Sequence, residues 1–242
     1  MNARYLFEYV CLVVLTQCGF ADSVLSPNPH SIGHSSYGPF FITESLAGST
    51  RFQEVHGAVD FRSVGSPMFI TEFALWRGLG SDPIDVTLPS IVIHFSTTAG
   101  VPHQLSSTFA GNIGPDEASV FSGALHLVDT GGEFGISIPL QTPFYYDPQR
   151  GNLLMDIWNY DTIPDPGGYG INWQGTWSDS VSGLSTVRNA GELSGALYDG
   201  GMITRFTVIP VPEPSPWLLL VVGMAVIVLF RVFCSRIARS AP

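Results

Sequence analysis

The sequence predicts an all-β body, a single antiparallel β-sandwich of the jelly-roll type, between an N-terminal signal peptide and a C-terminal transmembrane helix. Three observations indicate the body. Gly, Pro, Ser and Thr are plentiful while charged residues make up only 12% of the chain. Short segments alternate between apolar and polar residues, and no segment outside the termini keeps a helical period. Many short strands joined by tight turns are typical of sandwiches and jelly rolls.

Eight segments have the composition or alternation of strands. They are residues 40–43, 51–56, 68–76, 91–96, 125–128, 134–138, 153–158 and 202–209. In the fourth, Ile91, Ile93 and Phe95 are expected on one face of the sheet, opposite Val92 and His94. In the third, Phe69, Thr71, Phe73 and Leu75 are expected opposite Ile70, Glu72 and Ala74. Turn residues separate the strands, as in Gly131-Gly132.

Residues 1–21 have the features of a secretory signal peptide. Arg4 comes early, an apolar run follows at 10–15, and the small residues Gly19 and Ala21 suit a cleavage site after Ala21. A lipoprotein attached through Cys18 is the alternative, although Gln17 is bulky where a small residue is wanted. Either reading indicates export, so the body is expected to span residues 22–209.

The C-terminal residues 217–234 are expected to form a transmembrane helix. Residues 217–230 are all apolar or Gly, and at 1.5 Å per residue they span about 21 Å, less than the ~30 Å hydrocarbon core. Extension to Cys234 gives about 27 Å and encloses Arg231, whose side chain can snorkel to the headgroups. Arg231, Arg236 and Arg239 follow without an acidic residue, which keeps the basic end, 235–242, in the cytoplasm.

Residues 210–216 form a Pro-rich stalk just before this helix. Prolines at every second position block helix and sheet pairing and leave an extended, accessible backbone. The sequence Val211-Pro212-Glu213-Pro214, the short helix and the arginines together resemble the PEP-CTERM sorting signal, although Val, Phe, Ile and Ala dilute the basic end. The resemblance implies an inner-membrane intermediate that an exosortase, a membrane protease, cuts near the motif. A plain single-pass anchor with a Pro-rich stalk is the alternative.

Three parts of the body are similar to a domain that recurs in exported proteins with the same tail. They are residues 51–56, residues 96–98 with 105–110, and residues 143–157. The resemblance supports the architecture and implies no site.

Cysteine usage and charge exclude several classes of protein. Cys11, Cys18 and Cys234 all lie in the terminal segments, so the body has no disulfide, thiolate metal site or cysteine nucleophile. Lysine is absent, and between Asp22 and Glu213 there are 19 acidic residues against 6 arginines, a formal net charge of −13. This charge argues against nucleic acid or an anionic membrane surface as a partner.

No pattern in the body predicts catalysis, a cofactor or a metal site. There is no Gly-x-Ser-x-Gly elbow and no paired-histidine motif. His30 and His34 are four apart, but Pro29 and Gly33 predict a loop there. His94 and His126 are expected on a polar sheet face. The weaker alternatives are paired carboxylates (Asp156 with Glu133, or Asp161 with Asp165) for glycoside hydrolysis, and structural calcium at 129–133 or 161–165.

The strongest candidate for binding is the aromatic loop within residues 159–179. Tyr160, Tyr169, Trp173 and Trp177 alternate there with carboxylate and amide side chains, a combination that suits sugar recognition. The competing interpretation places Trp173 and Trp177 in the core of a strand or hairpin. We therefore expect an exported, exosortase-processed surface or matrix protein without catalytic activity, associated with extracellular polysaccharide, or alternatively a carbohydrate-binding module that uses this loop.

Overall fold

The structure is a computed structural model, and it describes residues 21–28, 34–37, 40, 49–65, 67–76, 84–160, 172–176, 180–211 and 223–224. Gly19–Val211 form one compact unit. The predicted signal peptide, the Pro-rich stalk beyond Val211 and the predicted membrane helix lie outside the described residues, except for Ala21 and the helical Gly223 and Met224. Within the part of the chain that is described, no helix has the length and apolar character to cross a bilayer.

β-strands dominate the described residues, as the sequence predicts, and helix is almost absent. The strands are β1 (Asp22–Ser26), β2 (His34–Tyr37), β3 (Ser49–His56), β4 (Met68–Leu75), β5 (Asp85–Thr98), β6 (Ala118–Val128), β7 (Ile136–Tyr146), β8 (Asn152–Asn159), β9 (Asn172–Thr176), β10 (Val181–Arg188), β11 (Ala196–Asp199), β12 (Gly201–Met202) and β13 (Thr204–Pro210). Two 3-10 turns, η2 (Ala58–Phe61) and η3 (Phe109–Asn112), lie between them.

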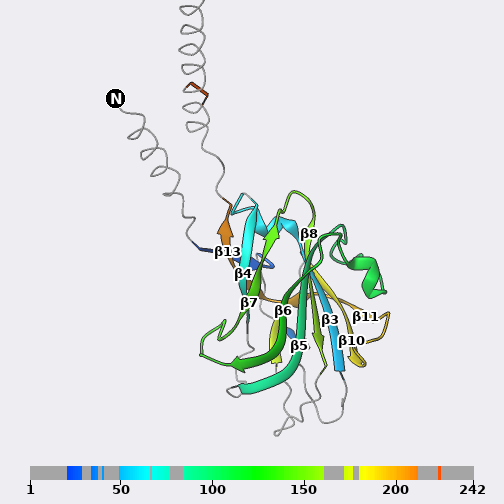
Figure 1. Cartoon of the computed structure of the whole chain (residues 1–242). Coiled ribbons are helices and arrows are strands. Elements are labelled where there is room, and N and C mark those ends of the chain that lie inside the picture. Colours follow the sequence, from blue (N-terminus) through cyan, green and yellow to red (C-terminus); the bar gives the residue numbers. More distant parts are fainter. Residues whose placement is uncertain are drawn as a thin grey trace, which may run out of the picture. The chain divides into compact units, whose positions relative to one another are not determined.

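The strands form two large antiparallel sheets and one small sheet (Figure 1). The four-stranded sheet has the order β1-β13-β4-β7, and the six-stranded sheet has the order β11-β10-β3-β8-β5-β6. The small sheet has the order β12-β9-β2. Four pairings are nested along the chain: β5 with β6, β4 with β7, β3 with β8, and β1 with β13. These eight strands therefore form one long hairpin whose successive pairs are divided between the two large sheets.

One hydrophobic core joins the two large sheets, as in a sandwich. Phe95, on β5 of the six-stranded sheet, is fully buried. Its ring centroid lies 6.0 Å from that of Phe73 on β4, 5.8 Å from that of Phe144 on β7, and 6.3 Å from that of Phe206 on β13. Phe95 thus contacts three strands of the opposite sheet, and the same inward alternation buries Ile91 and Ile93 completely, as predicted.

The alternation predicted for β4 is wrong at its first residues because the strand contains a bulge. The pairing of β4 with β13 shifts register between Thr207 and Val208, which leaves Thr71 as an extra residue of β4. The extra residue reverses the faces, so Phe69 is 41% exposed whereas Ile70 is buried together with Phe73.

Several strands differ from the predicted set. Phe40 lies in a turn and residues 41–43 of the predicted 40–43 strand lie outside the described residues. The expected loop at His34 is wrong, because His34 opens β2. The strands β1, β2, β9, β10 and β11 were not predicted. They are short or rich in Ser and Gly, so each carries too few apolar residues to mark a face.

The segment between β5 and β6 covers part of the outer face of the six-stranded sheet. Leu105 and Phe109 from this segment pack with Val55 of β3, Leu154 of β8 and Leu184 of β10 in a second, smaller apolar cluster. The central strands β3 and β8 are consequently buried on both faces along most of their length.

Replacement of Gly114 by alanine should destabilise the body, because Gly114 holds this segment against β5. Its N–H donates to Ser96 Oγ at 3.1 Å, and an added Cβ would overlap the Thr97 carbonyl oxygen and lie 2.6 Å from its carbon. We expect a loss of about 1–3 kcal/mol in the free energy of unfolding, measured by urea denaturation. Gly191→Ala is the control, since the nearest atom to its Cβ is the Asn189 side-chain oxygen at 3.3 Å. Equal stability of the two variants would contradict the close approach.

Candidate functional site

A buried ion pair lies on the outer face of the six-stranded sheet. Arg51 of β3 donates from Nε to Asp156 Oδ1 at 3.1 Å and from Nη2 to Asp156 Oδ2 at 2.6 Å. The side chains are only 8% and 2% exposed. Such a two-point contact fixes the planar guanidinium against the carboxylate.

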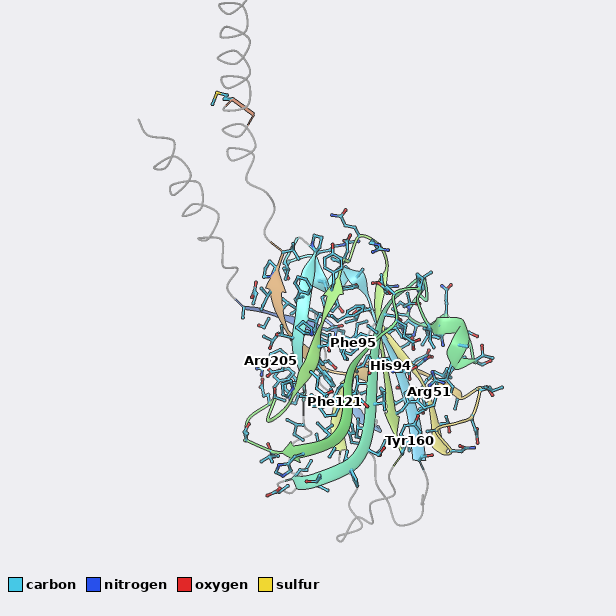
Figure 2. The ribbon with its side chains drawn as sticks, in the orientation of Figure 1. Arg51, His94, Phe95, Phe121, Tyr160 and Arg205 are labelled. Atoms are coloured by element: carbon cyan, nitrogen blue, oxygen red, sulfur yellow. The ribbon has the colours of Figure 1, made fainter. Side chains whose placement is uncertain are left out.

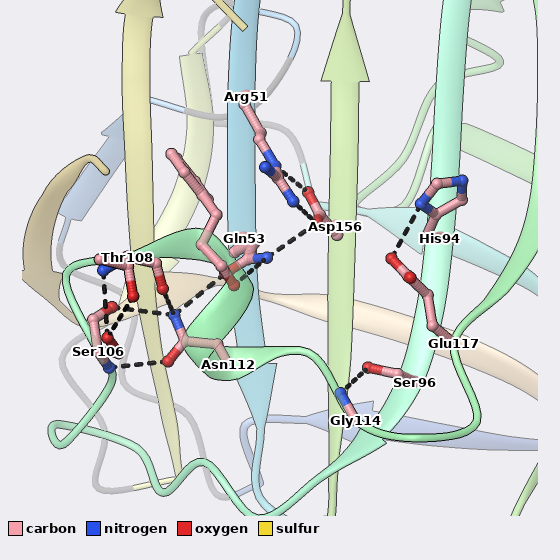
Figure 3. Close-up of polar contacts among 11 residues, drawn as sticks. Arg51, Gln53, His94, Ser96, Ser106, Thr108, Asn112, Gly114, Glu117 and Asp156 are labelled. Atoms are coloured by element: carbon pink, nitrogen blue, oxygen red, sulfur yellow. Dashed lines mark hydrogen bonds and ion pairs between the residues drawn. The ribbon is translucent and has the colours of Figure 1, made fainter. Parts of the chain in front are cut away.

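The ion pair continues into a network that attaches η3 to the sheet (Figure 3). Gln53 Nε2 donates to Asp156 Oδ2 at 2.8 Å and to the Phe109 carbonyl at 3.2 Å. Asn112 Nδ2 donates to Gln53 Oε1 at 3.1 Å, while Asn112 Oδ1 accepts the Ser106 N–H at 2.7 Å. Each member therefore has partners, which keeps a buried polar network stable.

Four side chains are stacked beside this network, and we call them the aromatic column. The guanidinium of Arg51 lies 4.4 Å from the ring centroid of Phe109 and 3.8 Å from that of Trp158. The Trp158 ring stacks in turn on Tyr160, with centroids 5.9 Å apart and planes inclined by 27°. The column begins in the buried cluster at Phe109 and ends at Tyr160, which is 48% exposed.

Tyr160 is fixed by its backbone as well as by stacking. It directly follows β8, and its N–H donates to the Ser90 carbonyl of β5 at 3.1 Å. Arg51, His94 and Tyr160 are all labelled on the six-stranded sheet in Figure 2. The exposed end of the aromatic column is thus held rigidly.

Polar groups flank the column on β5 and β6. His94 pairs in register with Asp156, and its Nδ1 lies 3.2 Å from Glu117 Oε1, with the two side chains 28% and 38% exposed. Val92 pairs with Trp158 on one side and with the exposed Ser122 on the other. The polar face predicted for His94 and His126 is confirmed, since the side chain of His126 is 57% exposed.

The predicted binding residues are only partly described. Tyr160 is exposed, as a sugar-binding residue must be. Trp173 lies in β9, as the competing interpretation expects, but its side chain is not described. Tyr169 and Trp177 lie outside the described residues. Sequence reasoning missed Trp158, which it treated only as the end of a buried strand.

The sorting motif begins where the described body ends. Val211 donates its N–H to the Pro67 carbonyl at 2.8 Å. Pro212, Glu213 and Pro214 lie outside the described residues.

The alternative carboxylate and calcium sites receive no support where they are described. The Asp156 carboxylate is bonded to Arg51 and Gln53. Asp129 Oδ1 accepts the Gly131 N–H at 2.9 Å in a tight turn, where Gly131 and Gly132 have φ of +84° and +83°. The described residues contain no group of three or more potential metal ligands. Asp161 and Asp165 lie outside them.

A serine, a histidine and two acids form a polar cluster inside the core. Ser26 Oγ lies 2.9 Å from His56 Nδ1 and donates to Asp60 Oδ2 at 2.7 Å. His56 Nε2 lies 3.3 Å from Glu54 Oε1. Ser26, Glu54 and His56 are fully buried and Asp60 is 4% exposed. The cluster connects β1, β3 and η2 through side chains.

Burial determines the protonation states of the side chains in this cluster. It raises the pKa of Glu54 to about 8, and the Met202 N–H bond opposes this only in part. Burial also lowers the pKa of His56 to about 3. Because the Ser26 proton goes to Asp60, Nδ1 of neutral His56 must donate to Ser26. Its Nε2 then carries no proton and lies 3.3 Å from Oε1 of the protonated Glu54 carboxyl group.

This arrangement cannot work as a nucleophilic triad. A catalytic histidine must accept the serine proton and reach a substrate, whereas here the serine donates to Asp60 and no atom of the three side chains faces solvent. This buried polar cluster therefore has a structural role.

Comparisons with known proteins add no function. The sequence matches no protein-family model and no curated protein. A crystal structure of a protein from Sulfurospirillum deleyianum aligns over 82% of this chain and 94% of its own, with 10% identity and a TM-score of 0.18. That score supports no statement about fold or function.

Proposed function

We propose that the chain is an exported, non-catalytic surface or matrix protein that an exosortase-type membrane protease processes and that associates with extracellular polysaccharide. The observation that carries the proposal is the C-terminal arrangement of Pro212-Glu213-Pro214, the apolar residues 217–230 and three arginines. The hydrogen bond from Val211 to Pro67 supports it, because cleavage near the motif would leave the described strands whole.

The chemistry of the described body supports the proposal of a non-catalytic protein. Its cluster of serine, histidine and acidic side chains is buried, and Asp156 is paired with Arg51. Both groups have structural roles that would be lost if they reacted with a substrate.

We infer a jelly roll for the body. The four nested pairings support it, since a jelly roll is a long hairpin rolled into two sheets. Strands β10 and β11 then extend the six-stranded sheet beyond the eight strands of that motif.

Mass spectrometry of the protein from its native host tests the processing. We expect a C-terminus near Pro212–Pro214 and the loss of residues 217–242. Glu213→Ala should accumulate the unprocessed chain, whereas Glu192→Ala, an exposed acidic control in the body, should be processed like the wild type. An intact C-terminus on the mature wild-type protein would leave only a plain anchor.

A carbohydrate-binding module is the second candidate. The observation that favours it is Tyr160, which is exposed and stacked on Trp158.

A further inference from the structure

We propose that the exposed face of Tyr160, at the end of the aromatic column, binds an uncharged pyranose glycan. The surface consists of Tyr160 and Trp158 with His94, Glu117 and Ser122 at its edge, and we call it the Tyr160 platform. The proposal deepens the second candidate function and rests on the proposed extracellular setting only for the source of the glycan.

The stacking geometry leaves one face of Tyr160 for a ligand. The near-parallel Trp158 ring lies against Tyr160 with an offset, at a centroid distance of 5.9 Å, and Tyr160 remains 48% exposed. Trp158 is itself supported from behind by Arg51, which Asp156 holds in place. The platform is therefore preorganised, and binding would order few additional side chains.

The chemistry of the platform matches a sugar ring better than a wholly apolar partner. The face of an aromatic ring is electronegative and attracts the electron-poor C–H groups of a pyranose. The hydroxyl groups of the neighbouring sugar units also need hydrogen-bond partners, and the partly exposed His94 and Glu117 offer them. Tyr160 and His94 stand four residues apart on paired strands, or about 13 Å, so an oligosaccharide can reach both.

The negative charge of the body favours neutral glycans over anionic ones. Arg51 is the cation of the aromatic column, and Asp156 neutralises it. The body between Asp22 and Glu213 carries 19 acidic residues against 6 arginines. Uronic acids and sulfated sugars would be repelled, so the expected ligand is neutral.

A second exposed tyrosine provides a matched control. Tyr145 of β7 is 43% exposed, close to the 48% of Tyr160. It lies on the four-stranded sheet, where it pairs with Phe69 of β4 and meets the Phe69 ring at an interplanar angle of 67°. Loss of either tyrosine removes a similar exposed ring, but only Tyr160 belongs to the platform.

The test uses protein purified from cells that express the full chain. The probes are neutral oligosaccharides, cellohexaose and laminarihexaose, with oligogalacturonate as the anionic probe, and affinity is measured by isothermal titration calorimetry. We expect at least one neutral probe to bind. Tyr160→Ala should weaken that binding by about tenfold or more, whereas Tyr160→Phe and Tyr145→Ala should bind like the wild type. Circular dichroism checks that each variant is folded.

Three results would overturn the proposal. They are no binding of either neutral probe, preference for oligogalacturonate, and unchanged affinity in folded Tyr160→Ala protein. None of them bears on C-terminal processing, which mass spectrometry decides separately. An intact C-terminus, conversely, would overturn the processing and leave the platform standing.

Discussion

Replacement of Glu54 by glutamine should abolish a fall in stability that we expect in the wild-type protein between about pH 6.5 and pH 8. Glutamine has the shape of the protonated carboxyl group. Its amide can donate to His56 Nε2, and its carbonyl can accept the Met202 N–H that now bonds to Glu54 Oε2 at 3.0 Å. The variant therefore keeps the buried contacts of the neutral acid and cannot become an anion.

The sign follows from proton binding in the folded and unfolded states. The pKa of Glu54 rises from 4.5 to about 8 on folding, so the folded state binds more protons and stability is lost as pH rises through this range. The pKa of His56 falls from 6.5 to about 3, so stability from this group increases with pH up to 6.5. The two effects cancel between 4.5 and 6.5. Above 6.5 only the Glu54 effect remains, at about 1.4 kcal/mol per pH unit at most.

Other titrating groups around the pair make a comparison of variants necessary. Asp60 has a pKa raised by burial, and Tyr198, whose pKa burial and the Glu54 charge both raise, also faces Glu54. Asp60 contributes alike in the wild type and Glu54→Gln, and Tyr198, with a pKa well above its ordinary value, stays uncharged up to pH 8 in both. The difference between the two proteins therefore isolates Glu54. Urea denaturation at several pH values should show that difference growing from about pH 4.5 to pH 8. A constant difference would mean that Glu54 is ionised in the core. Glu133→Gln, at an exposed site, should follow the wild type throughout.

Removal of Arg51 should be among the most damaging single changes in the body. Arg51→Ala leaves the Asp156 carboxylate, 2% exposed, without its cation. It also removes the group between Phe109 and Trp158. An uncompensated buried charge typically costs about 3–5 kcal/mol, a large part of the roughly 5–15 kcal/mol that stabilises a domain. Urea denaturation near pH 7 should show this loss.

Two further variants separate the ion pair from a general effect of losing arginine. Arg150→Ala removes an exposed arginine in the turn before β8 and should change stability by less than about 0.5 kcal/mol. Arg51→Met combined with Asp156→Leu removes both charges and should be less destabilised than Arg51→Ala. If Arg51→Ala were no less stable than Arg150→Ala, the ion pair would contribute nothing.

The sequence predicts a strand well where one face is uniformly apolar, as in Ile91, Ile93 and Phe95. It fails for β10 because the inward position at Gly183 has no side chain. Tyr198, from the neighbouring β11, lies over Gly183, and a Cβ there would overlap its ring. The side chain that fills the inward position of β10 thus comes from β11, so the sequence of β10 alone lacks the apolar residue that would predict a strand. The bulge in β4 is likewise invisible in the alternation of its residues.

The candidate site was less predictable than the fold because it depends on register between distant strands. Tyr160 was found through its aromatic and polar neighbours in sequence. Arg51 and Trp158 are brought together by the pairing of β3 with β8, and Phe109 arrives on a separate segment. Glu54 and His56 face inward because they alternate along β3 with Phe52, which lies in the core.

The nested hairpin imposes an order on folding. β13 lies between β1 and β4, so two ladders of the four-stranded sheet require the last strand of the body. Phe206 and Val208 of that strand also complete the core. A chain delivered N-terminus first, whether by synthesis or through a membrane, must hold β1 and one side of β4 unpaired until residues 204–210 arrive. Such distant pairings form slowly. Completion of the fold therefore coincides with delivery of the residues directly before Pro212, and until then the four-stranded sheet lacks two of its three ladders.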